Sequence, residues 1–214
     1  MYKILFIDED PETRRTFVSE FDDYHEFEIV DLAPINDLNE MVIEVCKISS
    51  DVVIIDYRLN DKMRINYNGV VLRKAIKQEN TIKPVYLFSH YIDELHEETD
   101  DVWTSFEKGL VINNDNKQSF EDFISKMKID IEDTNNKYTK ALFEYNELLT
   151  KWRTQGYLGS REREELLNCD SILGRSQSHP LELPKELKDY YIQQELNEWI
   201  ESVNKLVSQL EQGE

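Results

Sequence analysis

The chain has 214 residues, of which 32% are charged, and its formal net charge is −19 at pH 7. Binding to nucleic acid or to anionic lipid needs a cationic surface, so we expect neither as a partner of so acidic a chain. No apolar run approaches the ~20 residues of a membrane span, and no signal peptide is recognisable. With two widely spaced cysteines, Cys46 and Cys169, these features predict a cytoplasmic protein.

The first 127 residues alternate between short apolar runs and amphipathic stretches. The apolar runs, each of which predicts a buried strand, lie at residues 3–7, 27–30, 52–55, 84–88 and 110–112. The helical patterns lie at residues 12–21, 37–48, 69–78 and 92–108, with a last helix from about residue 118. Five successive strand–helix units predict an α/β domain with a five-stranded parallel sheet that helices cover on both faces.

Polar side chains follow three of these strands directly. The first strand ends in Asp8-Glu9-Asp10, the third in Asp56 and the fourth in Ser89. The carboxyl ends of parallel strands meet at one edge of a sheet, so these groups should face one crevice. Crowded carboxylates need a cation, and hard oxygen ligands that leave room for phosphate suit Mg²⁺. A carboxylate beside such a metal can act as a nucleophile towards a phosphoryl group, which a nearby hydroxyl can bind.

At these positions the sequence resembles the receiver domain of two-component response regulators. The resemblance covers roughly residues 1–127. It lies in the segments Phe6-Ile7-Asp8-Glu9-Asp10-Pro11, Asp51-Val52-Val53-Ile54-Ile55-Asp56 and Lys83-Pro84-Val85-Tyr86-Leu87-Phe88-Ser89, and in Gly69. It implies a flavodoxin-like fold with strand order 2-1-3-4-5.

The resemblance also implies a chemistry for the crevice. Asp56 would accept a phosphoryl group from a histidine kinase or a phosphotransfer protein, and Ser89 would be the switch hydroxyl. The ligands of Mg²⁺ would be Asp8, Glu9, Asp56 and the backbone carbonyl of Arg58. The protein would then be a phosphoacceptor that signals or buffers phosphate through protein contacts, without being an enzyme.

Two departures from the family pattern leave a second hypothesis open. Receivers carry a lysine at the end of the fifth strand, but alignment on the last helix places Asn116 there, and Lys117 fits only with a one-residue shift. The loop from Asp56 to Gly69 is also longer than usual in the family. Either Asp56 is phosphorylated and the domain switches, or the chain is a non-phosphorylated pseudo-receiver that acts as a dimeric scaffold or adaptor.

The C-terminal third is predicted to be helical. Between residues 118 and 155, apolar or neutral residues recur in alternating steps of four and three, which indicates the seam of a coiled coil or a helical hairpin. The members of this seam are Phe120, Ile124, Met127, Ile131, Thr134, Tyr138, Ala141, Tyr145, Leu148 and Trp152. Gly156 is a natural end for this helix, which would be about 57 Å long.

Further along, the sequence predicts a helix at residues 161–168, a loop at 169–183 and another helix with a stripe from Leu196 to Leu210. We therefore expect a receiver domain at residues 1–127, followed by an α-helical dimerisation and output module at residues 128–214. That module continues the last receiver helix, and its two stripes would pack antiparallel within one chain or across a dimer. It is either a plain structural module or, as we expect, one that makes the protein a homodimer. It carries no catalytic motif and no basic recognition helix, so we expect neither a catalytic output nor DNA binding.

Overall fold

The structure is a computed structural model that describes residues 1–60, 65–80, 82–99, 101–112 and 117–173, together with Ile200 and Lys205. Its chain divides into two compact units, Met1–Ser178 and His179–Glu214. Most of the second unit, including the predicted stripe from Leu196 to Leu210, lies outside the described residues. The predicted boundary at residue 127 stays a prediction.

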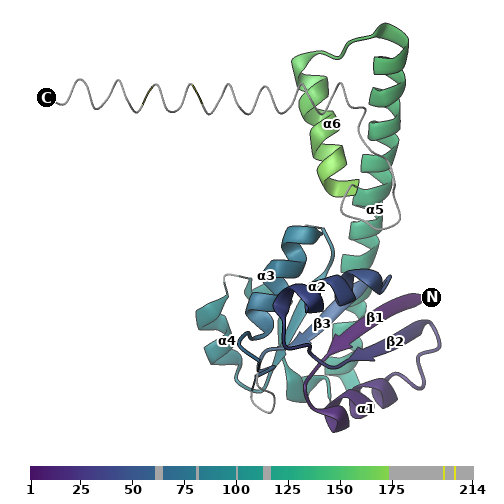
Figure 1. The fold of residues 1–214 in the computed structure, drawn as a ribbon. Helices are drawn as coiled ribbons and strands as arrows, with labels where there is room; N and C mark the ends of the chain where they lie inside the picture. The colour runs from purple at the N-terminus through teal and green to yellow at the C-terminus, as the bar shows by residue number, and fades with distance from the viewer. Residues whose placement is uncertain are drawn as a thin grey trace, which may run out of the picture. The chain divides into compact units, whose positions relative to one another are not determined.

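The elements of the first unit alternate between strands and helices (Figure 1). The strands are β1 (Tyr2–Ile7), β2 (Phe27–Leu32), β3 (Val52–Asp56), β4 (Val85–Ser89) and β5 (Ser105–Glu107). The helices are α1 (Pro11–Glu20), α2 (Leu38–Lys47), α3 (Gly69–Glu79), α4 (Ile92–Glu98), α5 (Lys117–Gln155) and α6 (Ser160–Leu173). Two 3₁₀ turns, η1 (Val102–Thr104) and η2 (Lys108–Leu110), flank β5.

The described strands form one sheet in the order β2-β1-β3-β4-β5, and every neighbouring pair is parallel. This is the order predicted for a flavodoxin-like receiver fold, so the predicted fold class is confirmed. Its switch point lies between β1 and β3, whose registers align Ile7 with Ile55. The carboxyl ends of these two strands therefore lie side by side, and that is where such folds place their chemistry.

Side chains of alternating strand positions fill two separate cores. On one face, Phe6 of β1 packs with Phe17 of α1 and with Phe120 and Phe123 of α5. On the other face, the cluster includes residues of α2, α3 and α4, with Leu95 of α4 fully buried. The central strands are covered on both sides, which explains their uninterrupted apolar sequences.

Polar side chains cap the starts of three helices. Asp10 accepts a hydrogen bond from the Glu12 N–H, and Pro11 occupies the first turn of α1. Asp37 caps α2 and Asn68 caps α3 in the same way. Such caps satisfy backbone N–H groups that have no partner within the helix, and each contributes about 1 kcal/mol. Asp10 is therefore occupied as a cap.

The fifth strand differs from the prediction. Residues 110–112 were expected to form it, but β5 is the short segment Ser105–Glu107, and a 3₁₀ turn follows it. The expected helix over residues 92–108 is shorter as well, because α4 ends at Glu98. Val111 and Ile112 are buried, so their apolar character reflects packing against α5 and not a strand.

The seam predicted along α5 is confirmed as far as Tyr145, although Leu149 and not Leu148 is the buried residue of the next turn, and its two halves have different partners. Phe120, Ile124, Met127 and Ile131 belong to the core beneath the sheet. Further along, buried residues of α5 pack against α6, which lies alongside this half of the helix (Figure 1). These residues of α5 are Ala141, Tyr145 and Leu149, and those of α6 are Leu166, Cys169 and Leu173. The helical-hairpin interpretation of the seam is thus confirmed within the described part.

The turn between α5 and α6 follows the sequence prediction at its start. α5 ends at Gln155, and Gly156 adopts a φ of 76°, the left-handed conformation that favours glycine at a helix end. α6 runs to Leu173, so the loop predicted from Cys169 begins at least five residues too early. None of the described helices combines the length and the apolar character that a membrane-spanning segment requires.

Candidate phosphoacceptor site

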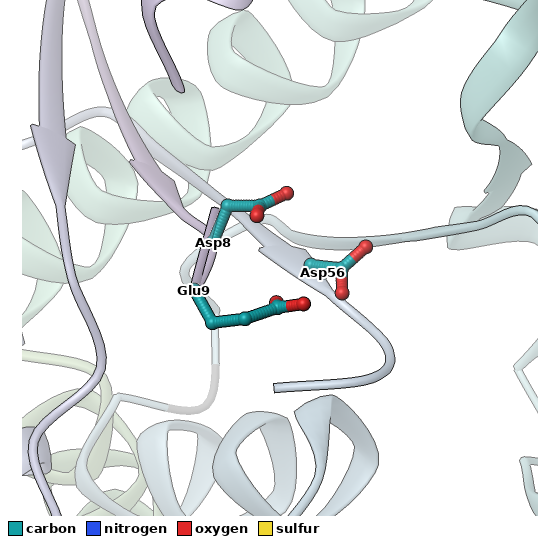
Figure 2. Close-up of side chains that lie close together, drawn as sticks. All are labelled: Asp8, Glu9 and Asp56. Atoms are coloured by element: carbon teal, nitrogen blue, oxygen red, sulfur yellow. The ribbon is translucent and has the colours of Figure 1, made fainter. Parts of the chain in front are cut away.

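Three carboxylates meet at the switch point of the sheet. Asp8 and Glu9 follow β1, and Asp56 is the last residue of β3 (Figure 2). One carboxylate oxygen from each of the three lies within 4.8 Å of the others. The structure thus brings together the acidic residues that the sequence suggested, because β1 and β3 are adjacent parallel strands.

A lysine that sequence reasoning missed completes this cluster. The Lys108 ammonium lies 2.6 Å from Asp8 Oδ2 and 2.7 Å from Asp56 Oδ1, and all three side chains are buried. Lys108 follows β5 directly, so it occupies the place that the receiver pattern reserves for its lysine. Burial tends to lower the pKa of Lys108, but the charges of Asp56 and Asp8 outweigh it and raise that pKa above its ordinary value.

Lys117, which the sequence suggested for this role, lies elsewhere. Its side chain is 83% exposed at the start of α5, and its ammonium is 4.0 Å from Glu121 one turn along the same helix. The sequence prediction combined a fifth strand at residues 110–112 with an alignment on the last helix, whereas the observed strand ends at Glu107. Lys108 therefore takes the position beside Asp8 and Asp56, and Asn116 lies outside the described residues.

Hydrogen bonds hold Asp8 and Asp56 in fixed orientations. Asp8 Oδ1 accepts the Asp10 N–H at 2.8 Å, while its other oxygen accepts from Lys108. Asp56 Oδ2 accepts the Arg58 N–H at 3.0 Å, and Oδ1 accepts from Lys108 at 2.7 Å. Burial raises the pKa of Asp8, and the Lys108 charge opposes that rise. Each oxygen of both carboxylates thus has a donor.

Glu9 differs from Asp8 and Asp56 because one oxygen of its carboxylate has no hydrogen-bond donor. Glu9 Oε2 is buried without a hydrogen-bond partner, which is costly for a carboxylate oxygen. Burial, followed by the charges of Asp56 and Asp8, raises the pKa of Glu9 to about 7. The single charge of Lys108 balances only one of the three carboxylates, which leaves two negative charges when all are ionised.

These observations fit a divalent cation. An orphaned carboxylate oxygen, three oxygen donors and an excess of two negative charges match the ligands and the charge of Mg²⁺. Asp8, Glu9 and Asp56 would hold it. Arg58 lines the same cleft, and the predicted use of its backbone carbonyl as a further ligand stays a prediction.

Ser89 lies in the same cleft, at the end of β4. This cleft has a volume of about 300 Å³, and its lining includes Glu9, Asp56, Ser89 and Lys108. Ser89 Oγ accepts the Tyr91 N–H at 2.8 Å, so its own proton can point to a group beside Asp56. The space suits a small tetrahedral anion together with a few waters.

Gly69 is explained by its close approach to the end of β3. A Cβ at this position would overlap the backbone oxygen of Asp56 and lie 3.0 Å from Tyr57 Cα. The Gly69 N–H donates to the Tyr57 carbonyl at 2.8 Å. Only glycine lets the start of α3 press against the end of β3, so this residue fixes the backbone that carries Asp56.

The segment after Asp56 is tied to α4. The Arg58 guanidinium lies 3.6 Å from the centroid of the Tyr91 ring and 2.5 Å from Glu94 Oε2. The Tyr57 hydroxyl donates to Glu98 Oε1 at 2.7 Å. Acidic residues of α4 therefore hold Tyr57 and Arg58, the two residues that follow Asp56.

Comparisons with known proteins found similar solved structures only at low sequence identity. No family model and no curated protein matches the chain. It is similar to the chemotaxis response regulator CheY4 of Vibrio cholerae, with 19% identity and a TM-score of 0.44 over 59% of this chain and 98% of that one. It is also similar to the response regulator RcsB of Salmonella typhimurium, with 14% identity and a TM-score of 0.41 over 89% and 97%. Because these values are low, the fold rests on the strand order and the site on its geometry.

Proposed function

We propose that the protein is a phosphoacceptor of a two-component or phosphorelay system and that Asp56 receives the phosphoryl group. The observation that carries this proposal is the buried Lys108, which contacts both Asp8 and Asp56 in a cleft that also holds Glu9 and Ser89. A lysine at this position was the main feature missing from the sequence resemblance. With it present, one of the two departures that left the pseudo-receiver hypothesis open is removed, and the longer loop between Asp56 and Gly69 is the other.

The transfer itself needs little from the protein beyond position and charge. A carboxylate oxygen of Asp56 forms a bond to phosphorus as the phosphorus–nitrogen bond of a phosphohistidine donor breaks, and the imidazole nitrogen keeps the electron pair. The product is an acyl phosphate on Asp56. The Lys108 ammonium and the Ser89 hydroxyl then bind the phosphoryl oxygens, because both face the same cleft.

Mg²⁺ would be held by Asp8, Glu9 and Asp56, and when bound it neutralises charge on the phosphoryl oxygens. The expected donor is a histidine kinase or a phosphotransfer protein. We further propose that the protein is not an enzyme, that it resides in the cytoplasm and that it signals as a homodimer through protein contacts.

Intact-mass spectrometry of the full chain after incubation with Mg²⁺ and acetyl phosphate tests the proposal. Wild type should gain the mass of one phosphoryl group, and Asp56→Asn should not. Asp51→Asn is the matched control. Asp51 directly precedes the first residue of β3, at the other end of the strand from Asp56, so this variant should gain the same mass as wild type. If neither wild type nor Asp56→Asn gains this mass, the result supports the non-phosphorylated scaffold, and if both gain it, the phosphoryl group is on another residue; either result contradicts the proposal.

A further inference from the structure

A second pocket lies at the opposite end of the sheet from Asp56. It has a volume of about 260 Å³ and is formed by the segments that lead into β3 and β4, the ends of α2 and α3, and the middle of α5. We call it the base pocket and define it by six of its lining residues: Cys46, Ser50, Asp51, Ile76, Lys83 and Tyr138. Small-molecule sites typically occupy ~300–1,000 Å³, so this pocket suits a small ligand.

Most polar side chains around the base pocket are already satisfied by the protein. Asp51 Oδ2 accepts the Lys3 N–H at 2.7 Å, and Asn80 Oδ1 accepts the Lys83 N–H at 3.0 Å. The Thr134 hydroxyl donates to backbone carbonyls, including that of Ile82 at 3.2 Å. These groups therefore shape the pocket and have little capacity left for a ligand.

Two polar groups of the base pocket are not satisfied. Ser50 Oγ is buried and has no hydrogen-bond partner. Among the described residues, no carboxylate lies within ion-pair distance of the half-buried Lys83 ammonium, although the charge of Asp51 acts on it at longer range. Burial lowers the pKa of Lys83 below its ordinary value, which reflects the cost of an ammonium without a close counter-ion.

Besides the polar residues Ser49 and Asn135, the rest of the wall is mainly apolar or aromatic. Val45, Ile48, Ile76, Ile82 and the ring of Tyr138 contribute to it. A ligand that satisfies both parts of the pocket needs an anionic oxygen head for Lys83 and Ser50 and a short apolar body for these side chains. A buried charge-assisted hydrogen bond is about twice as strong as a neutral one, so the head would supply specificity.

We infer that the base pocket is a binding site for a small organic anion with an apolar body, such as a medium-chain carboxylate, whose head contacts Lys83 and Ser50. The bound molecule would touch Tyr138 of α5 together with the turns before β3 and β4. It would therefore link the base of the sheet to the helix that leaves it. Neither Asp56 nor any other residue of the phosphoacceptor cleft takes part.

Octanoate is a suitable probe, and 1-octanol is its uncharged counterpart. Binding to the full chain can be followed by amide chemical shifts of residues 45–51, 82–83 and 134–138. Protection of Cys46 from alkylation, compared with Cys169 by peptide mapping, gives a second readout, since Cys46 lines the pocket and Cys169 lies between α5 and α6. We expect saturable octanoate binding, selective protection of Cys46 and no comparable effect of 1-octanol.

Two variants test the roles of the head-group contacts. Lys83→Met should weaken octanoate binding about tenfold, because it keeps the apolar stem and removes the charge-assisted hydrogen bond. Ser50→Ala should weaken it by roughly threefold without reducing stability, because the hydroxyl has no partner to lose. Lys47→Met is the matched control, because that lysine is exposed on α2 and pairs with Glu44, and it should bind as wild type does.

Urea denaturation of every variant shows whether weaker octanoate binding comes from the lost side-chain contact or from unfolding of the protein. The inference is overturned if octanoate at millimolar concentration produces no saturable shift in the base-pocket amides. It is equally overturned if folded Lys83→Met binds octanoate as tightly as Lys47→Met does.

Discussion

Lys108 is the residue on which the electrostatics of the site depend. Its ammonium is buried between Asp8 and Asp56, so removing it leaves two buried carboxylates without their counter-charge. Removal of one partner from such a pair typically costs about 3–5 kcal/mol. Lys108→Met should therefore lower the free energy of unfolding by about 3 kcal/mol in the absence of Mg²⁺, as measured by urea denaturation.

Lys117→Met is the matched control for that experiment. Its ammonium is exposed and makes only a loose pair with Glu121, and exposed helix pairs contribute about 0.5 kcal/mol or less. Equal losses of stability in the two variants would contradict the assignment of Lys108 to the site.

Among the three carboxylates, that of Glu9 most clearly indicates a bound cation, because its Oε2 is buried without a hydrogen-bond partner. Mg²⁺ should raise the thermal midpoint of wild type relative to EDTA, because a ligand that binds only the folded state stabilises it. Glu9→Gln should reduce that shift, since it removes the carboxylate whose oxygen has no other partner. Glu12→Gln, on the exposed first turn of α1, should keep the full shift. A Mg²⁺ response that is the same in both variants would exclude Glu9 as a ligand.

Gly69 should tolerate no side chain. Gly69→Ala puts a Cβ against the backbone of Asp56 and Tyr57, and forced overlaps in a packed region cost about 1–3 kcal/mol. Gly109→Ala has open space around its Cβ and should be nearly neutral. Urea denaturation of the two variants checks the difference, and comparable stabilities would show that the close approach at Gly69 imposes no strain.

The polar residues Asp8, Asp56 and Ser89 could be predicted as site residues from sequence because each one ends an apolar run. Asp8, Asp56 and Ser89 end runs of buried residues, so their common edge follows from the parallel topology alone. Lys108 follows Ser105, Phe106 and Glu107, none of which is fully buried. A strand at the edge of a sheet needs no apolar run, so periodicity gave no signal for it. The remaining clue was Phe106, an aromatic residue two positions before an isolated lysine.

At the level of elements, a hydrophobic stripe shows that a face is buried but not what covers it. The steps of three and four along α5 continue past Ile131, where the helix stops packing on the sheet and begins to pack on α6. Thr134 and Tyr138 lie at this change and line the base pocket. The sequence predicted the helix and its end at Gly156, whereas the change of partner depends on the tertiary arrangement.

The contact between α5 and α6 rests on a few fully buried side chains. Leu166→Ala should destabilise this hairpin by about 3 kcal/mol, because the leucine is 0% exposed and its removal leaves a cavity. Its neighbour Leu167 is 37% exposed, so Leu167→Ala should cost much less. Hydrogen exchange of the α6 amides can compare the two. If hydrogen exchange becomes faster to the same degree in both variants, the observation that α6 packs on α5 through Leu166 and not through Leu167 is contradicted.

For the whole molecule, the predicted homodimer depends on residues beyond the receiver domain. Light scattering should give a dimer for the full chain and a monomer for a chain that ends at Lys137. That end point keeps Ile131 and Thr134, which contact the α/β part, and removes the hairpin. If the full chain and the shortened chain have the same number of chains per particle, dimerisation through the C-terminal helices is contradicted.

The central claim is that Asp56 becomes an acyl phosphate, and chemical trapping tests it most directly. The full chain is incubated with Mg²⁺ and acetyl phosphate and then reduced with borohydride, which converts an aspartyl phosphate to homoserine, and the product is mapped by peptide mass spectrometry. We predict homoserine at position 56 and at no other aspartate, dependent on Mg²⁺. Absence of homoserine at position 56, or its appearance instead at Asp8, would contradict the proposed function.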